Sequence, residues 1–108
     1  MHYSMTDYNN AKVLRVQGEL DALSCPELRP ILDALTRDDR CRIVVDLSEV
    51  KVVDCSGVGF LVSLYKRARE KGESVSFVGV TDQPLRLFRL LRLDHVFVLT
   101  PNESKAAA

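Results

Sequence analysis

The chain has 108 residues, of which 46% are hydrophobic and 28% are charged, which is enough apolar content for one core. Its 15 basic and 15 acidic residues cancel to zero net charge, Trp is absent and aromatic residues make up 6%. This composition argues against nucleic-acid binding through a basic patch or through base stacking. The sequence predicts a single domain over residues 1–101 that binds a protein or a small ligand, followed by a tail over residues 102–108. The last three residues of this tail, Ala106–Ala108, resemble a cloning remnant.

The three cysteines are Cys25, Cys41 and Cys55. Their number is odd and no pair has C-x-x-C spacing, so the sequence predicts neither a disulfide framework nor a zinc site, but buried, reduced thiols. We find no signal-peptide pattern and no apolar run long enough to cross a bilayer. We therefore expect a cytoplasmic protein without membrane insertion, metal ion or cofactor.

The start of the chain predicts a β-hairpin. Residues His2–Tyr8 alternate in polarity, Asn9-Asn10 tolerate the left-handed backbone of a tight turn, and Lys12–Val16 form a second apolar run. The segment Gly18–Asp21 then predicts a loop.

A first helix is predicted to begin at Ser24, with Glu27 completing a capping box. The polar run Arg37–Arg40 is predicted to end it. Its apolar stripe at helical spacing consists of Leu28, Ile31, Leu32 and Leu35.

A continuous β-branched run, Ile43–Val45, predicts a central strand covered on both faces, and Val50–Val53 predict a short extended turn. A second helix is predicted to begin near Ser56 and to end with Gly72 as its C-cap. Its apolar stripe consists of Leu61, Leu64, Tyr65 and Ala68.

A third buried strand is predicted over Val75–Val80, a third helix opens at Thr81–Pro84, and a last strand over Val96–Leu99 is stopped by Pro101. The apolar positions of the third helix are Leu85, Phe88 and Leu91. The order β-β-α-β-α-β-α-β predicts an α/β fold. Its mixed sheet has about five strands, opens with a hairpin, continues mostly in parallel and is backed by helices.

The segment that carries chemistry is Val53–Gly59, where a carboxylate, a thiol, a hydroxyl and two glycines stand between a strand and a helix. Asp21 also follows a strand, so we expect it at the same sheet edge, where ligands bind in such folds. A phosphate on Ser56 would lie in the field of the helix start and carry about −1.5 to −2 charges. Asp21 and Asp54 would add to the repulsion of a partner, which predicts a docking switch.

A plainer interpretation is that Ser56 or Asp54 caps the helix while the glycines pack. Catalysis by Ser56 with His95 is disfavoured because the G-x-S-x-G elbow is absent. A reactive Cys55 is opposed by the neighbouring carboxylate. The basic residues around Lys66–Lys71 and the arginines of the third helix are interpreted as solvated faces. Those arginines are Arg86, Arg89 and Arg92.

Several stretches resemble a known family. Gly18–Asp21 resembles its G-E-L-D, Val44–Ser48 resembles its V-V-L-D-L-S strand end, and Asp54–Gly59 resembles its D-S-S-G-L-G. These stretches occur in the same order as in the STAS domains of bacterial anti-sigma factor antagonists, and the resemblance covers roughly Tyr3–Pro101.

The resemblance implies a STAS-like sheet and a regulatory binding protein that is not an enzyme. In the family, the serine at the position of Ser56 is phosphorylated by a cognate anti-sigma factor that is itself a serine kinase, and a phosphatase reverses the step. The unphosphorylated form binds the anti-sigma factor and frees the sigma factor. Cys55 departs from the usual Ser or Thr and allows thiol oxidation beside the switch. The implied partner-binding residues are Asp21, Asp54, Cys55, Ser56, Gly57 and Gly59.

Three alternatives stay open at this point. The chain is an accessory subunit of a transport or stress-signalling complex, a nucleotide-sensing module, or a hydrolase that depends on Ser56 or Cys55.

Overall fold

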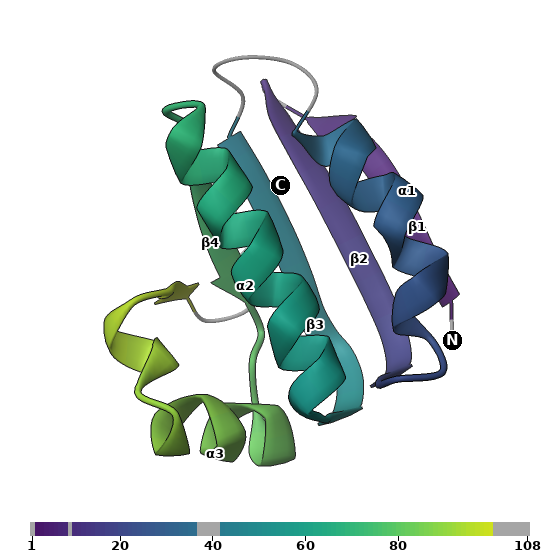
Figure 1. The fold of residues 1–108 in the computed structure, drawn as a ribbon, viewed down its shortest axis with the longest axis vertical. Helices are drawn as coiled ribbons and strands as arrows, with labels where there is room; N and C mark the ends of the chain where they lie inside the picture. The colour runs from purple at the N-terminus through teal and green to yellow at the C-terminus, as the bar shows by residue number, and fades with distance from the viewer. Residues whose placement is uncertain (1, 9, 37–41, 101–108) are drawn as a thin grey trace.

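The structure is a computed structural model that describes residues 2–8, 10–36 and 42–100 (Figure 1). The described residues do not include Asn9 of the predicted hairpin turn, the polar run Arg37–Arg40, Cys41, Pro101 or the tail over residues 102–108. The elements in chain order are β1 (His2–Tyr8), β2 (Ala11–Leu20), α1 (Cys25–Leu35), β3 (Arg42–Val53), α2 (Cys55–Glu70), β4 (Ser74–Val78), α3 (Asp82–Leu90), the 3-10 helix η1 (Leu93–His95) and β5 (Val98–Thr100).

The strands form one sheet in the order β1-β2-β3-β4-β5. The first pair is antiparallel and the other three pairs are parallel, which confirms the predicted mixed sheet. The chain passes from each parallel strand to the next through a helical crossover. Crossovers that have the same handedness and move along the sheet in the same direction place their helices on the same face. Figure 1 shows α1 and α2 side by side on that face.

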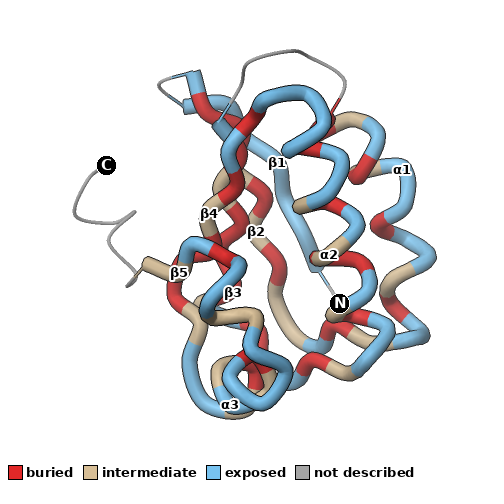
Figure 2. Tube along the Cα trace, turned by 60° about the vertical axis from the view of Figure 1, so that its left-hand side comes forward, coloured by how far each residue is buried: buried red, intermediate tan, exposed pale blue. Residues whose placement is uncertain are grey.

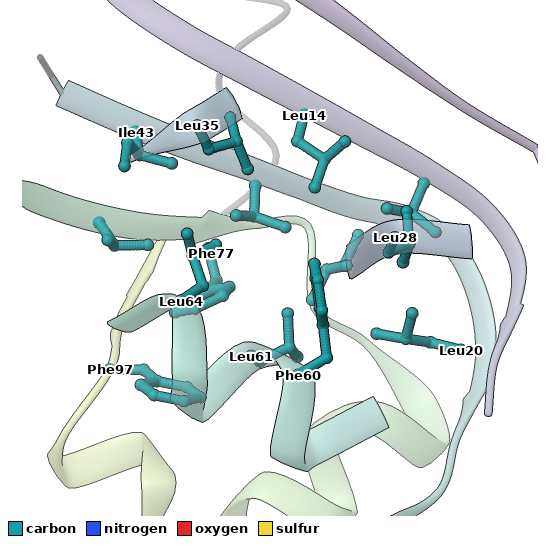
Figure 3. Packing of buried hydrophobic residues seen from close by; sticks show 14 of the residues in the cluster. Leu14, Leu20, Leu28, Leu35, Ile43, Phe60, Leu61, Leu64, Phe77 and Phe97 are labelled. Carbon is teal, nitrogen blue, oxygen red and sulfur yellow. The ribbon is translucent and has the colours of Figure 1, made fainter. Parts of the chain in front are cut away.

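The core lies between the sheet and the helices, where alternate residues of the central strands face inward (Figures 2 and 3). The predicted apolar stripes of the two helices form the helical side of the core. Leu28 and Leu35 of α1 and Leu61 and Leu64 of α2 are fully buried there. An aromatic cluster closes one end, with ring centroids 4.4–6.4 Å apart among Phe77, Phe88 and Phe97.

Two predicted strand ends are wrong, and both strands run further than expected. Glu19 pairs with Val52 and Leu20 with Val53, so Gly18–Leu20 are strand rather than loop and Val50–Val53 are strand rather than turn. Irregular pairing near Gly18 lets the two strands stay together to their ends. As a result, Asp21 and Asp54 each follow directly after a strand at the same end of the sheet.

The end of β3 reaches beyond its partner β4, and α3 supplies the missing hydrogen bonds. The side-chain amide of Gln83 accepts from the Val53 backbone N–H at 2.9 Å and donates to the Val53 carbonyl at 3.0 Å. These two bonds satisfy the backbone N–H and C=O groups of the buried Val53. They also hold in place the residue that precedes Asp54.

The end of α2 follows the sequence prediction. Gly72 has a φ of +74°, and the next N–H, from Glu73, donates to the Ala68 carbonyl at 2.8 Å, as in a glycine-terminated helix.

The C-terminal elements differ from the prediction. Strand β4 ends at Val78, and the last strand begins at Val98 instead of Val96 because Leu93–His95 form a 3-10 turn. Leu91 is exposed rather than buried, since the chain leaves the helix there and reverses at Arg92, which has a φ of +60°.

Candidate functional site

The candidate site lies where β2 and β3 end together. The Asp54 N–H donates to the Leu20 carbonyl at 3.2 Å, and the Ala22 N–H donates to Oδ2 of Asp54 at 3.2 Å. The loop that carries Asp21 is thus tied directly to the start of α2. The structure therefore brings together the two acidic segments that the sequence predicted at one edge.

Asp54 is the N-cap of α2. Its backbone is extended, with φ −105° and ψ −173°, and its Oδ1 accepts from the Gly57 N–H at 3.0 Å. Its two carboxylate oxygens therefore bind two backbone amides, one in the helix and one in the neighbouring loop. The capping role that the plainer interpretation left open between Asp54 and Ser56 belongs to Asp54.

Asp21 organises the loop before α1. Its Oδ1 accepts from the N–H groups of Leu23 at 3.1 Å and Ser24 at 3.0 Å. The Ser24 hydroxyl accepts from the Asp21 N–H and donates to the Glu19 carbonyl, both at 2.9 Å. The predicted capping box is therefore wrong: the Ser24 backbone is already helical, so its hydroxyl turns back to the loop instead of the helix.

The two glycines of the motif have different reasons to be present. A Cβ on Gly57 would lie 2.3 Å from the Leu20 carbonyl oxygen, so the fold requires glycine where α2 crosses the end of β2. A Cβ on Gly59 would meet nothing within 4 Å. Gly59 is exposed, and the packing of this chain gives no reason for its missing side chain.

Ser56 and Cys55 are both exposed in the first turn of α2. Among the described residues, the Ser56 hydroxyl has no hydrogen-bond partner, so it is free to accept a modification or to contact a partner. The amides of Gly57 and Val58 already donate to Asp54, to its carboxylate and its carbonyl respectively. A phosphate on Ser56 would thus face a helix start that already holds a carboxylate.

A groove of about 400 Å³ runs from Ser56 between α1 and α2. Both apolar and polar residues line it, and Arg29 is the one charged residue among the described residues of the lining. The lining residues are Ala22, Cys25, Pro26, Arg29, Leu32, Ser56, Gly59, Phe60 and Ser63.

Sequence reasoning missed two residues beside the site. Leu23 is 90% exposed at the tip of the Asp21 loop, and Arg29 faces the groove. Leu23 stands outside any predicted helical stripe, and this was the signal available in the sequence. The position of Arg29 depends on how α1 packs against α2, which the spacing of residues does not show.

The described thiols differ from the expected buried pattern. Cys55 is exposed and Cys25 is half-buried. Burial raises the pKa of the Cys25 thiol above its ordinary value, and the nearby carboxylates of Asp54 and Asp21 raise it further.

The structure gives no support to the catalytic alternatives. His95 is exposed on η1 with its Nε2 4.0 Å from a carboxylate oxygen of Asp94, and no hydrogen bond of the described residues links it to Ser56. In the described part of the chain, no group of three or more His, Cys, Asp or Glu residues is placed to hold a metal ion. Within residues 2–8, 10–36 and 42–100, no helix is long and apolar enough to cross a membrane.

The basic residues of α2 and α3 are exposed, as the solvated-face interpretation predicts. Arg67 pairs with Asp33 and Arg69 donates to the Tyr65 hydroxyl.

The chain is similar in sequence to curated proteins called anti-sigma-B factor antagonists. It is 32% identical over 80 residues to the protein of Staphylococcus aureus, covering 74% of each chain. It is 28% identical over 81 residues to that of Listeria monocytogenes, covering 75% of this chain and 71% of the relative.

Solved structures share the fold. An anti-sigma factor antagonist from Mycobacterium paratuberculosis superposes with a TM-score of 0.82 at 27% identity, over 98% of this chain and 90% of the other. The anti-sigma factor antagonist SpoIIAA in its unphosphorylated form superposes with a TM-score of 0.79 at 15% identity, over 97% and 93% of the two chains. A family model described as "Mlab, STAS domain" matches residues 4–101. The chain belongs to the STAS domain family.

Proposed function

We propose that this chain is an anti-sigma factor antagonist that binds its cognate anti-sigma factor, a serine kinase, through the surface around Ser56, and that phosphorylation of Ser56 releases it. A phosphatase that removes the phosphate restores binding. The observation that carries the proposal is the exposed Ser56 hydroxyl, which has no hydrogen-bond partner among the described residues and does not cap the helix. The names of the relatives support the same function.

The local chemistry supports a switch at this residue. A hydroxyl on the surface of a rigid helix start is accessible to a kinase, and neither its packing nor its hydrogen bonds resist the added phosphate. SpoIIAA, which shares the fold, is known in an unphosphorylated and a phosphorylated form. The two forms superpose on this chain with TM-scores of 0.79 and 0.75, so the fold tolerates both states.

Charge explains why a phosphate would end binding. Backbone hydrogen bonds hold the carboxylate of Asp54 two residues before Ser56 and that of Asp21 in the neighbouring loop, so the site is already acidic before modification. A partner that fits this surface therefore carries basic groups or leaves these oxygens hydrated. A phosphoserine adds about −1.5 to −2 charges and a bulky hydrated group where the partner must pack closely.

The docking surface extends from Ser56 to the loop before α1 and into the groove. Leu23 projects from that loop, and the groove between α1 and α2 begins at Ser56. An exposed apolar side chain next to a groove supplies the buried contacts that usually dominate an interface. Gly59 lies along the groove and lets a partner approach the helix backbone.

Binding and phosphorylation by the purified anti-sigma factor test the proposal. Ser56→Ala should bind and resist phosphorylation, whereas Ser56→Asp should lose affinity by about 100-fold, because a like charge in an interface costs several kcal/mol. Ser74→Asp adds the same charge at an exposed residue of β4 and should bind normally. Equal binding of Ser56→Asp and Ser74→Asp would reject the charge switch.

Variants that keep the fold but change the loop or the groove test whether the partner binds this surface. Leu23→Ala and Gly59→Gln change exposed positions, so neither should unfold at a lower denaturant concentration than the wild type. Both should weaken the complex by at least about ten-fold if the loop and the groove contact the partner. Normal binding by both would place the interface elsewhere.

One observation favours a second candidate. A sulfate transporter family protein from Wolinella succinogenes shares the fold with a TM-score of 0.73 at 14% identity over 87% of this chain, which fits a STAS accessory subunit of a transport complex. Such a subunit would use the same surface without phosphate transfer. Co-purification with a transporter ATPase, together with an unmodified Ser56 under all growth conditions, would support this candidate over the first.

A further inference from the structure

We infer that β1 is a dimerisation strand, through which two copies of this chain pair antiparallel and join their sheets. All seven residues of β1 are exposed, and the strand is drawn pale blue along its length in Figure 2. In the described part of the chain β1 forms ladder pairs only with β2, so over residues 2–7 its other edge presents unpaired backbone N–H and C=O groups. This inference is independent of the proposed function.

The strand has few of the features that keep edge strands apart. Edge strands are usually short, bulged, or protected by charged side chains, lysine above all, or by proline. Strand β1 is seven residues long, pairs with β2 over its whole length without a bulge, contains neither lysine nor proline, and carries one carboxylate, Asp7. The opposite edge, β5, is only three residues long. The long edge is therefore the one suited to pairing.

The side chains of β1 are complementary to themselves around a twofold axis at Met5. In this register Met5 faces its own copy, Tyr3 faces Asp7 and Ser4 faces Thr6. Each pair joins residues of one face, because antiparallel partners in this register have the same parity. Tyr3 and Met5 are large apolar residues, 42% and 36% exposed, and they lie on the face that carries the helices, opposite Val16 and Leu14 of β2.

This geometry gives a closed dimer. A twofold pairing uses the β1 edge of both copies and leaves no further β1 edge to extend. Ser56 lies on α2, which covers the middle of the sheet (Figure 1). Pairing at β1 therefore leaves the candidate docking surface of each copy accessible. Because each copy contributes one strand, we expect weak association, with a dissociation constant on the order of 0.1 mM.

Disulfide trapping tests the register. Across the axis, the two Cα atoms at position 5 would be about 4.5–5.5 Å apart, within the range of a disulfide. The two Cα atoms at position 3 would be about 14 Å apart, because they are offset by four residues along the strand. In a Cys55→Ser background, Met5→Cys should therefore cross-link on mild oxidation at least ten-fold faster than Tyr3→Cys.

Charge substitution gives a second test. Tyr3→Lys places a cation opposite Asp7 of the other copy, whereas Tyr3→Glu places an anion there. Two such pairs form per dimer, so sedimentation equilibrium should show about ten-fold tighter association for the lysine variant. Wild-type protein that stays monomeric at roughly ten times the expected dissociation constant, equal trapping at positions 3 and 5, or growth beyond dimers would each overturn the inference.

Discussion

Replacement of each glycine in the first turns of α2 by alanine should change stability in opposite directions. At Gly57 the added methyl group would lie 2.3 Å from the Leu20 carbonyl oxygen and 3.0 Å from side-chain atoms of Leu20 and Val53. The nearest atom is backbone, and the same oxygen accepts the Asp54 N–H, so it must move by about 1.1 Å to restore ordinary contact. That movement disturbs the junction of β2, β3 and α2.

The magnitude follows from two destabilising terms and one stabilising term. Overpacking of this kind costs about 1–3 kcal/mol, and weakening of the Asp54 hydrogen bond adds about 1 kcal/mol. Alanine offsets at most about 1 kcal/mol through its better helix propensity. We therefore expect Gly57→Ala to lower the free energy of unfolding by about 2 kcal/mol. In Gly59→Ala the added methyl group has no neighbour within 4 Å, so this variant should raise the free energy of unfolding by about 0.5–1 kcal/mol.

Urea unfolding followed by circular dichroism measures both variants. The slope of the transition should stay constant, so the shift of its midpoint reports stability directly. Equal stability of Gly57→Ala and Gly59→Ala would refute this prediction, because the close approach to the Leu20 carbonyl would then carry no cost.

Three further measurements examine the same region. Asp54→Ala should lose about 1–2 kcal/mol of unfolding free energy because the Gly57 N–H loses its cap, while Asp54→Asn should keep most of it, and equal loss in both would contradict a capping role. Gln83→Ala should cost about 1–3 kcal/mol, since a buried backbone pair of Val53 loses its partner, and an unchanged urea midpoint would show that solvent replaces it. Cys25 should react with iodoacetamide more slowly than an unperturbed thiol at mildly alkaline pH, because burial and Asp54 raise its pKa and reduce the thiolate fraction. Asp54→Asn should accelerate that reaction, and no change on substitution would exclude the electrostatic contribution.

Local pattern in the sequence was sufficient for the class of fold and the order of its elements. The alternation of His2–Tyr8 predicts β1 to the residue, and Gly72 marks the end of α2 because only a left-handed residue terminates a helix in that way. Both features depend on interactions within a few residues. Resemblance in the motif around Ser56 also pointed to the family, since these residues are adjacent in the chain.

Features that depend on contacts between distant segments came only from the tertiary structure. The ends of β2 and β3 extend because the two strands pair with each other, although each segment alone resembles a loop or a turn. Asp54 became the cap and Gly57 the close contact because α2 starts against Leu20, which lies 30 or more residues earlier. The sequence thus determined which residues could form a switch, whereas three-dimensional packing decided that Asp54 and Gly57 hold the fold and left Ser56 and Gly59 exposed. The physical reason is that helix and strand periodicity are local properties, while hydrogen-bond satisfaction and close packing depend on the whole fold.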